Sequence, residues 1–231
     1  MSFWQILKRD FTEPLRQDPA CNGIFEIFFC YPGVWALINY RFAHFFYERG
    51  FKLIARAISG LSRIITAVDI NPGARIGSGV FFDHATGLVI GETAIIGDNC
   101  LIYQGVTLGG VSLEHGKRHP TLQNGVVVGA GAKVLGNITI GENSKIGANS
   151  VVVKDVAPNC TAVGVPARIL GGCESDPLAH NKIPDISQEL IKYLIKRIEI
   201  LEDCICSGRK DISAMDEDLN KFYEEYLKSL K

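Results

Sequence analysis

Residues 126–147, Val-Val-Val-Gly-Ala-Gly-Ala-Lys-Val-Leu-Gly-Asn-Ile-Thr-Ile-Gly-Glu-Asn-Ser-Lys-Ile-Gly, decide the fold of this chain. An aliphatic side chain recurs in them every six residues, at Val128, Val134, Ile140 and Ile146. Six is neither the period of a helix nor that of a simple strand. A step of six with glycine punctuation predicts a parallel β-helix, in which three hexapeptides close one triangular coil.

The same period extends over residues 69–152. Residues one coil apart should stack, so Ile90 should lie under Leu108 and Val128 under Ile146. Glycine follows most of these aliphatic residues, and we expect it to supply a sharp turn with positive φ. Small residues two positions earlier should fit the narrow interior; these are Ala94, Ala132, Ser144 and Ser150.

Two interruptions of the period carry the side chains best suited to chemistry. Leu108 and Val128 are twenty residues apart, three hexapeptides plus two, so a loop must leave the coil within residues 110–125. That loop carries two histidines, Lys117 and Arg118. The second interruption, between Phe82 and Ile90, contains Asp83 and His84. Loops on a rigid scaffold are frequent functional elements.

Composition excludes several classes of protein. The chain has 231 residues, 47% of them hydrophobic, and a formal charge of −1 without a basic stripe, so we expect no nucleic-acid partner. The longest uncharged apolar run, residues 27–40, is too short to span a bilayer, and the first residues do not resemble a signal peptide. Seven cysteines without metal or CxxC spacing favour reduced thiols and a cytoplasmic location.

Three regions are expected along the chain. Residues 1–66 form an N-terminal helical region, with apolar residues spaced by three and four. Residues 67–170 form the β-helix, and residues 171–231 form a linker and C-terminal helices. The heptad-like spacing from Ile191 to Ile205 fits either a helical hairpin or pairing between subunits, and the sequence does not choose.

The residue types at the two interruptions suit acid–base chemistry on a small zwitterion. His84 can act as a general base. Asp69, fifteen residues upstream, should lie on the neighbouring coil and orient the imidazole. Arg118 offers a planar fork for a carboxylate, and Asp83 can pair with an amine.

Several motifs, in order along the chain, closely resemble the serine O-acetyltransferase family of hexapeptide-repeat acyltransferases. They are Asp69-Ile-Asn-Pro72, Asp83-His-Ala-Thr-Gly87, Gly91-Glu-Thr93, Thr107-Leu-Gly-Gly110, Lys117-Arg-His-Pro120, Gly129-Ala-Gly-Ala-Lys133 and Gly164-Val-Pro-Ala-Arg168. Asp18-Pro-Ala20 resembles a motif of the family's helical domain. Repeat and resemblance together predict a left-handed parallel β-helix with a helical N-terminal region and a helical C-terminal tail.

The resemblance implies acetyl transfer from acetyl-CoA to the hydroxyl of L-serine for cysteine biosynthesis, without a covalent enzyme intermediate or a metal. It implies that His84 is the base and Asp69 its partner. Asp18 and Asp83 would hold the substrate ammonium, Arg118 would bind its carboxylate and His119 would help to place it. Acetyl-CoA would lie between subunits against backbone groups of Gly109, Gly129, Ala130, Gly131, Ala132 and Lys133.

The resemblance also implies partners. L-cysteine is expected to inhibit from the serine site, as in the family. The N-terminal region is shorter than in the family's long members, so we expect a homotrimer, with a dimer of trimers as the alternative. Members that bind O-acetylserine sulfhydrylase usually insert a terminal isoleucine, whereas this sequence ends in Leu230-Lys231, so that complex is expected to be weak or absent.

Three rival functions remain open from the sequence. Another hexapeptide acyltransferase, acting on a sugar or a different hydroxyl, would not need Arg118 and Asp83. A metal-dependent carbonic anhydrase could use His84, His115 and His119, although Lys117 and Arg118 would repel the cation. A non-catalytic scaffold would make the coincidence of Asp69, His84 and Arg118 meaningless.

Overall fold

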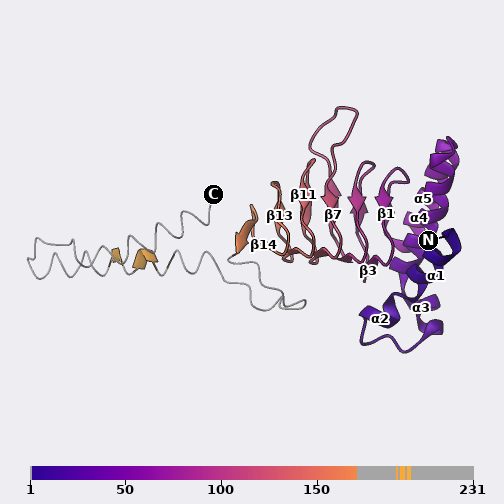
Figure 1. Ribbon diagram of the computed structural model, residues 1–231, viewed down its shortest axis with the longest axis horizontal. Helices are drawn as coiled ribbons and strands as arrows, with labels where there is room; N and C mark the ends of the chain where they lie inside the picture. Colours follow the sequence, from indigo (N-terminus) through magenta and orange to yellow (C-terminus); the bar gives the residue numbers. More distant parts are fainter. Residues whose placement is uncertain (1, 171–190, 192, 196, 199–231) are drawn as a thin grey trace, which may run out of the picture.

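The chain folds into a helical region followed by a parallel β-solenoid (Figure 1). The computed structural model describes residues 2–170, 191, 193–195 and 197–198. The described residues beyond 190 are helical, and the other predictions for the C-terminal tail lie outside the described residues. No helix in the described part of the chain is long and apolar enough to cross a membrane.

Five helices precede the solenoid. A capping box between Ser2 and Gln5 begins the first, and proline occupies the first position of the second and fourth. The C-cap of the fifth helix is Ala67, whose left-handed φ of 56° ends the helix before the first strand. The helices are α1 (Phe3–Thr12), α2 (Pro14–Gln17), α3 (Ile24–Cys30), α4 (Pro32–Glu48) and α5 (Lys52–Thr66).

Three parallel sheets form the faces of the solenoid, and successive coils add one short strand to each. The first sheet, called the A face, contains β1 (Asp69–Ile70), β4 (Val89–Ile90), β7 (Thr107–Gly109), β10 (Lys133–Leu135) and β13 (Val151–Val152). The B face contains β2 (Arg75–Ile76), β5 (Ile95–Ile96), β8 (Thr121–Leu122) and β11 (Thr139–Ile140). The C face contains β3 (Phe81–Asp83), β6 (Leu101–Tyr103), β9 (Val127–Val128), β12 (Lys145–Ile146), β14 (Thr161–Val163) and β15 (Arg168–Leu170), of which only β15 runs antiparallel.

The stacking predicted from the period of six is confirmed. Ile90 is the register partner of Leu108, and Val128 is that of Ile146. All four side chains are buried in one continuous apolar core. The small residues Ala94, Ala132, Ser144 and Ser150 are also fully buried, as expected for a narrow interior. A parallel β-solenoid of hexapeptide repeats is therefore the fold.

The expected role of the glycines after the stacked residues is wrong. Gly97, Gly129 and Gly141 do not have positive φ. They are required because the next coil passes too close for a Cβ, which at Gly129 would lie 2.6 Å from the backbone nitrogen of Ala148. The positive φ values occur three residues after the stacked aliphatic residue, at positions such as Asn99, Gly105, Gly125, Gly131, Asn143 and Asn149.

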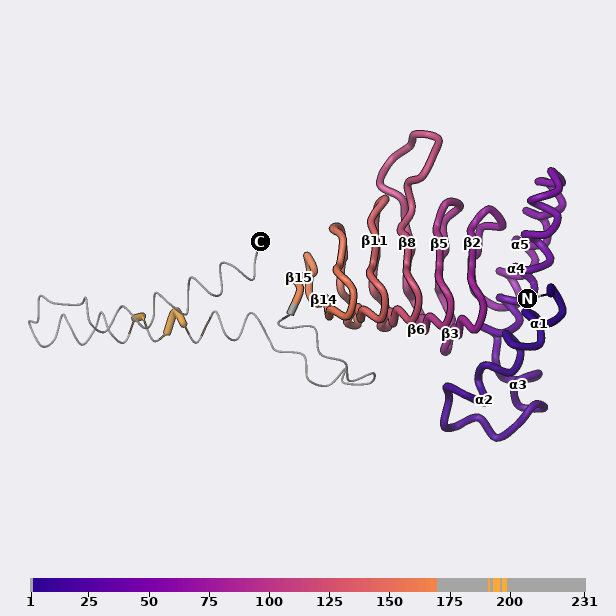
Figure 2. Tube along the Cα trace, viewed as in Figure 1, coloured from indigo at the N-terminus to yellow at the C-terminus, as the bar shows by residue number. Residues whose placement is uncertain are grey.

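Both predicted interruptions leave the coil. The larger one is a loop of residues 110–120 between β7 and β8, which projects beyond the other turns (Figure 2). Leu122, whose place in the period is not evident from the sequence, pairs with Ile96 inside the coil. The insertion is therefore eight residues, since 26 residues separate Leu108 from its partner Val134 instead of 18. The smaller one is the turn 84–88 between β3 and β4.

The helical region is bonded to the first coil. Arg41 of α4 is buried and pairs with the buried Asp10 of α1 at 2.8 Å, while its guanidinium donates to the carbonyls of Ile76 and Gly77. Tyr40 donates to the carbonyl of Ala74 at 2.6 Å. These bonds satisfy backbone groups at the end of the stack and hold α4 against the first coil, where α4 contacts β3 and α5 contacts β1.

The expectation of reduced thiols throughout is wrong for one cysteine. Cys160 is disulfide-bonded. Cys21, Cys30 and Cys100 are free, and burial raises the pKa of the Cys100 thiol to about 12. The Cys100 thiol therefore stays protonated and behaves as a small core residue.

Adding a methyl group at one of these glycines tests whether the next coil leaves room for a Cβ. In Gly141→Ala the new Cβ would lie 2.3 Å from the nitrogen of Pro158. We expect a loss of about 1–3 kcal/mol in the free energy of unfolding, the usual effect of overpacking. Urea titration would measure it.

Gly60→Ala in α5 is the matched control, because nothing lies within 4 Å of its Cβ. We expect that variant to gain up to about 1 kcal/mol from helix propensity. Equal stability of the two alanine variants would contradict the steric account.

Candidate active site

His84 begins the turn that joins β3 to β4. His84 and Ala85 have φ values of 55° and 58°, which is unusual for successive residues with a Cβ. Ala85 is fully buried, and Gly87 donates to the carbonyl of Ala67 at 2.8 Å. The turn is thus anchored from below, while the His84 side chain is 76% exposed. Backbone strain of this kind is typical of functional positions.

Two carboxylates lie near this histidine. Asp83 Oδ1 is 3.9 Å from His84 Nε2, and burial raises the pKa of Asp83. The charge of Asp18 raises the pKa of Asp83 further, so the two carboxylates are close enough to interact. Asp18 accepts hydrogen bonds from the Tyr31 hydroxyl and from the backbone of Ala20. The arrangement is a region of concentrated negative charge beside His84, suited to a cation.

Asp69 lies on the strand next to the His84 turn. Its backbone N–H donates to the carbonyl of Leu88 at 2.9 Å. Its carboxylate accepts from Arg63 at 3.2 Å. Within residues 2–170, no hydrogen bond joins Asp69 to His84 in this structure. The backbone of Asp69 therefore lies next to the His84 turn, as predicted. The Asp69 carboxylate, however, bonds to Arg63 instead of to His84.

Arg118 and His119 occupy the base of the loop 110–120 and contact the turn 91–94 below it. Arg118 Nη2 donates to Glu92 Oε2 at 2.6 Å. Thr93 Oγ1 accepts from the backbone N–H groups of Arg118 and His119. The Thr93 hydroxyl oxygen also lies 2.8 Å from His119 Nδ1. Glu92 and Thr93, which the sequence analysis only quoted within a motif, therefore hold both loop residues in place.

His119 is a buried neutral base. Burial lowers the pKa of its imidazole, and the charges of Arg118 and Lys117 lower it further. Its ring fills the space over Gly91, where a Cβ would lie 1.9 Å from the imidazole. The glycine is therefore required for the ring to lie against the coil.

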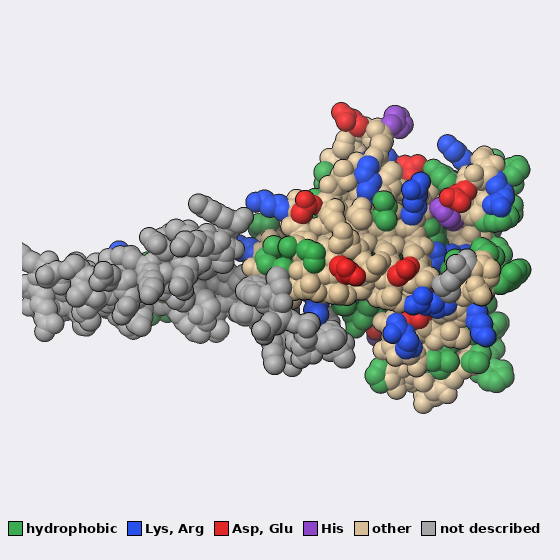
Figure 3. All heavy atoms as spheres, in the orientation of Figure 1, with side chains coloured by type: hydrophobic (Ala, Val, Ile, Leu, Met, Phe, Trp, Pro, Cys, Tyr) green, Lys and Arg blue, Asp and Glu red, His purple; other side chains and the backbone are tan. Residues whose placement is uncertain are grey.

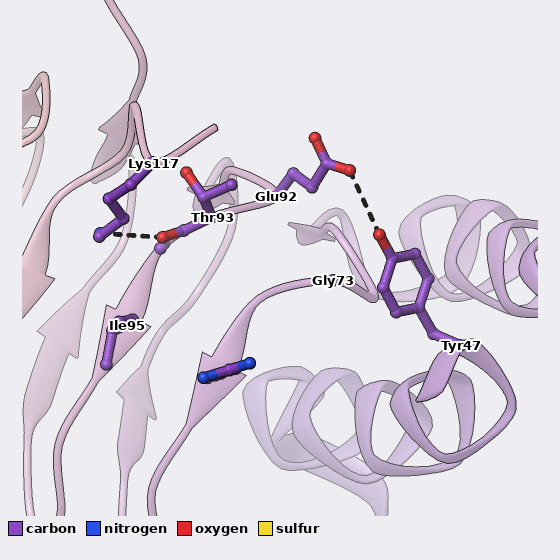
Figure 4. A pocket seen from close by; sticks show the side chains of 8 residues that line it. Tyr47, Gly73, Glu92, Thr93, Ile95 and Lys117 are labelled. Carbon is purple, nitrogen blue, oxygen red and sulfur yellow. Dashed lines mark hydrogen bonds between the residues drawn. The ribbon is translucent and has the colours of Figure 1, made fainter. Parts of the chain in front are cut away.

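A cavity of about 280 Å³ adjoins the loop base (Figure 4). Tyr47 of α4 and Lys117 lie on opposite sides of it, with Glu92 and Thr93 between them. Lys117 donates to the carbonyl of Thr93 at 2.9 Å, and burial lowers the pKa of the ammonium. Tyr47 donates to Glu92 Oε1 at 3.2 Å. The wall of this cavity thus includes residues of both the helical region and the solenoid.

The structure divides the expected site residues between two corners of the solenoid. His84, Asp83 and Asp69 lie at the corner between the C and A faces, called the His84 corner. Arg118 and His119 lie at the corner between the A and B faces, called the loop corner. The A face lies between the two corners and spans on the order of 15 Å at the rise of an extended chain. One small amino acid cannot reach both sets in one chain.

The positions expected to contact acetyl-CoA lie mainly along the His84 corner. A Cβ on Gly87 would meet Gly105 at 3.7 Å, and one on Gly105 would meet Gly131 at 3.5 Å, so these glycines form a row. Lys133 donates to the carbonyl of Gly105. Gly129, Ala130 and Ala132 belong to the same turn, whereas Gly109 lies on the A face beside Leu135.

One residue of this corner has no marker in the sequence. Gln104 Oε1 is buried and has no hydrogen-bond partner among the residues that the structure describes. A buried oxygen without a donor is rare and marks a position where a ligand group can bind.

Among the residues that the structure describes, no group of three or more His, Cys, Asp or Glu side chains is arranged to hold a metal ion. His119 faces Thr93 and lies at the loop corner, whereas His84 lies at the other corner. Within one chain, these positions do not form the three-histidine site that a carbonic anhydrase would need.

The family model described as "Bacterial transferase hexapeptide (six repeats)" matches residues 119–154. The serine acetyltransferase of Synechococcus elongatus is 54% identical over 202 residues, which cover 87% of this chain and 83% of the relative. That of Mycobacterium tuberculosis is 49% identical over 198 residues, covering 85% and 86%.

Solved serine acetyltransferases also match. The Neisseria gonorrhoeae enzyme in complex with serine has a TM-score of 0.70 and 44% identity, covering 73% of this chain and 69% of that one. The Brucella abortus enzyme with coenzyme A has a TM-score of 0.70 and 46% identity, covering 74% and 70%. A serine acetyltransferase in complex with cysteine has a TM-score of 0.71 and 43% identity, covering 73% and 70%.

The neutral state of His119 can be tested by NMR. Its folded pKa is lowered below the ordinary 6.5, so we expect the imidazole to titrate below pH 6.5 in the folded protein and near 6.5 in urea. Below pH 6.5 the unfolded chain then binds a proton that the folded chain does not, so this residue lowers stability as the pH falls.

Arg118→Ala removes one of the causes and should raise the His119 pKa part of the way back. A midpoint at or above 6.5 in the folded wild type would contradict the assignment.

Proposed function

Because the chain belongs to the serine acetyltransferase family, we propose that His84 is the general base of direct acetyl transfer from acetyl-CoA to L-serine. The observation that carries this proposal is the place of His84. It is an exposed imidazole on a strained, anchored turn, beside two interacting carboxylates and at the start of the glycine row. The base His84, the two carboxylates suited to a cation and the glycine row therefore lie at the same corner.

Asp18 and Asp83 are proposed to bind the ammonium of serine. Burial raises the pKa of Asp83, the charge of His84 partly offsets this, and repulsion by Asp18 raises the pKa further. A bound ammonium supplies the missing positive charge and favours the ionised form of Asp83. The Tyr31 hydroxyl donates a hydrogen bond to Asp18 and holds its carboxylate in place. The substrate ammonium therefore compensates the negative charge of Asp18 and Asp83.

The transfer itself requires little rearrangement. The serine hydroxyl oxygen forms a bond to the thioester carbon, and His84 accepts the hydroxyl proton. The carbon–sulfur bond then breaks, and the proton passes to the departing CoA thiolate. Such base catalysis contributes about 10²–10⁴-fold, and holding both substrates together supplies the proximity. Asp69 is proposed to stabilise the imidazolium after its carboxylate exchanges Arg63 for His84.

Acetyl-CoA is proposed to lie along the glycine row of the His84 corner. The row Gly87, Gly105 and Gly131 has no side chains, so an extended pantetheine arm can approach the backbone closely. Gln104 lies in the same turn as Gly105, and a rotation of its side chain would let its buried oxygen accept a hydrogen bond from an amide of that arm. Gly109, Gly129, Ala130, Ala132 and Lys133 supply the surrounding backbone.

Arg118 and His119 are proposed to bind the serine carboxylate from a neighbouring subunit. They lie at the loop corner, too far from His84 to share a small substrate within one chain. In a ring of identical subunits, the loop corner of one copy can face the His84 corner of the next. A homotrimer closes such a ring and gives three complete sites, and a dimer of trimers keeps the same sites.

Helix α5 offers a second reason for assembly. Its small and polar residues Ala55, Ser59 and Ser62 are buried against the protein, while Leu53 and Ile64 are 84% and 82% exposed. Apolar side chains gather on the outer surface of the helical end (Figure 3). Exposed apolar faces of this extent mark protein contacts. We assign this face to contacts between copies of the chain.

The remaining expectations follow from the same site. L-cysteine has the ammonium and carboxylate of serine and is proposed to inhibit by occupying its place. Nothing in the proposed transfer calls for a metal, and a cytoplasmic location fits a supply of both substrates. The tail expected to govern O-acetylserine sulfhydrylase binding lies outside the described residues.

Release of free CoA thiol from acetyl-CoA tests the reaction. Wild type should release thiol only when L-serine is present, and His84→Ala should lower kcat by about 10²–10⁴-fold. His115→Ala is the control, because that exposed histidine lies in the projecting loop 110–120 and has no role in the proposed transfer, so the variant should keep wild-type activity. Release with a sugar but not with serine would sink the substrate assignment.

Mixing two inactive variants tests the shared site. His84→Ala and Arg118→Ala chains, unfolded together in equal amounts and refolded, should regain about a quarter of wild-type activity at low serine concentration. The value follows because each mixed cyclic trimer rebuilds one intact site in three. Recovery no higher than the sum of the separately refolded variants would mean that the site is not shared.

A further inference from the structure

One interaction links the helical region to the residue proposed to bind the serine carboxylate. Glu92 lies between Tyr47 and Arg118, and each of its carboxylate oxygens has a different partner. Tyr47 donates to Oε1 at 3.2 Å, and Arg118 Nη2 donates to Oε2 at 2.6 Å. The hydrogen bond from Arg118 is the main cause of the lowered pKa of Glu92, and that from Tyr47 contributes. Figure 4 shows the Tyr47 side chain directed at Glu92 from α4.

The surrounding coil is shaped to fit this pair. Gly73 lies below both side chains, and a Cβ there would come within 3.0 Å of the Tyr47 hydroxyl oxygen and of the Glu92 side chain. Burial, followed by the charge of Glu92, raises the pKa of the Tyr47 hydroxyl, so it remains a donor at neutral pH. Tyr47 is therefore placed to fix the rotamer of Glu92.

Arg118 depends on Glu92 for its orientation. A guanidinium has five donors, and its side chain ends beyond four rotatable bonds. Among the described residues, its side chain otherwise donates only a long 3.4 Å bond to the carbonyl of Gly116. The bond to Glu92 uses one Nη2 donor, and apart from the long bond to Gly116 the described residues occupy no other donor of the Arg118 side chain. An arginine held in this way is pre-organised for a carboxylate.

We propose that Tyr47 is a positioning residue for serine binding: through Glu92 it holds Arg118 in the orientation that receives the serine carboxylate. The inference rests on the proposed function, because it gives Tyr47 a role only through Arg118. It also predicts a specific pattern. Tyr47 should affect the carboxylate-bearing ligands, serine and cysteine, and leave acetyl-CoA binding and the chemical step unchanged.

Steady-state kinetics on Tyr47→Phe, Glu92→Gln and the double variant test the proposal. Tyr47→Phe should raise the KM for serine roughly two- to tenfold, the range of a single hydrogen bond, with kcat and the KM for acetyl-CoA unchanged. Inhibition by cysteine should weaken by the same factor. Adding Tyr47→Phe to Glu92→Gln should raise the KM for serine less than Tyr47→Phe does alone, because the neutral amide that the hydroxyl then holds no longer pairs with Arg118 as a carboxylate.

Tyr40→Phe is the matched control. Tyr40 lies two turns earlier on α4 and also donates from the helix to the solenoid, but to the carbonyl of Ala74 instead of to Glu92. It should lower the Tm and leave every KM unchanged. If Tyr47→Phe is unstable, Glu92→Gln alone must still raise the KM for serine selectively.

Three results would overturn the inference while the proposed function stands. They are an unchanged KM for serine in active Tyr47→Phe, a parallel loss of kcat and of affinity for acetyl-CoA, and additive effects in the double variant. A wild type that releases no thiol with serine would instead overturn the proposed function, and this inference with it.

Discussion

The fold depends on how closely successive coils approach one another. Parallel strands are separated by about 4.8 Å, so each coil must fit its backbone against the next without intervening side chains at the turns. At Gly97, Gly129 and Gly141 the backbone of the following coil occupies the place of a Cβ. The aliphatic stack can be continuous only because these positions have no side chain. The flat faces and regular corners of the solenoid follow from this constraint.

A regular stack also determines how a site can be built on it. Its faces consist of two- and three-residue strands, so chemistry-bearing side chains are concentrated at the corners and in the one long loop. His84 and Arg118 therefore lie at different corners, with a whole face between them. A scaffold of this kind supplies half of a site at each corner, and a second copy is needed to bring the halves together.

The sequence predicted the parts that repeat. The stacking of Ile90 on Leu108 follows from the period alone, and the location of the loop follows from its interruption. The reason for the glycines was wrong, because a period shows that a small residue is needed but not whether φ or a neighbouring backbone demands it. Leu122 was overlooked, since the loop before it hides its place in the period. The roles of Glu92 and Tyr47 depend on contacts between distant segments, which neither a motif nor a period shows, and the burial of the Gln104 oxygen depends on the folded turn around it.

The buried pair of Asp10 and Arg41 has a consequence beyond stability. A parallel solenoid ends in strands whose N–H and C=O groups can accept another strand, so a bare end is a template for end-to-end polymerisation into fibres. Here Arg41 binds the carbonyls of Ile76 and Gly77, and α4 and α5 lie beside the first strands. Burying the Arg41 charge costs free energy, but it covers the carbonyls at the first coil, to which another strand could otherwise bond. The helical region therefore prevents a further strand from adding to this end of the solenoid.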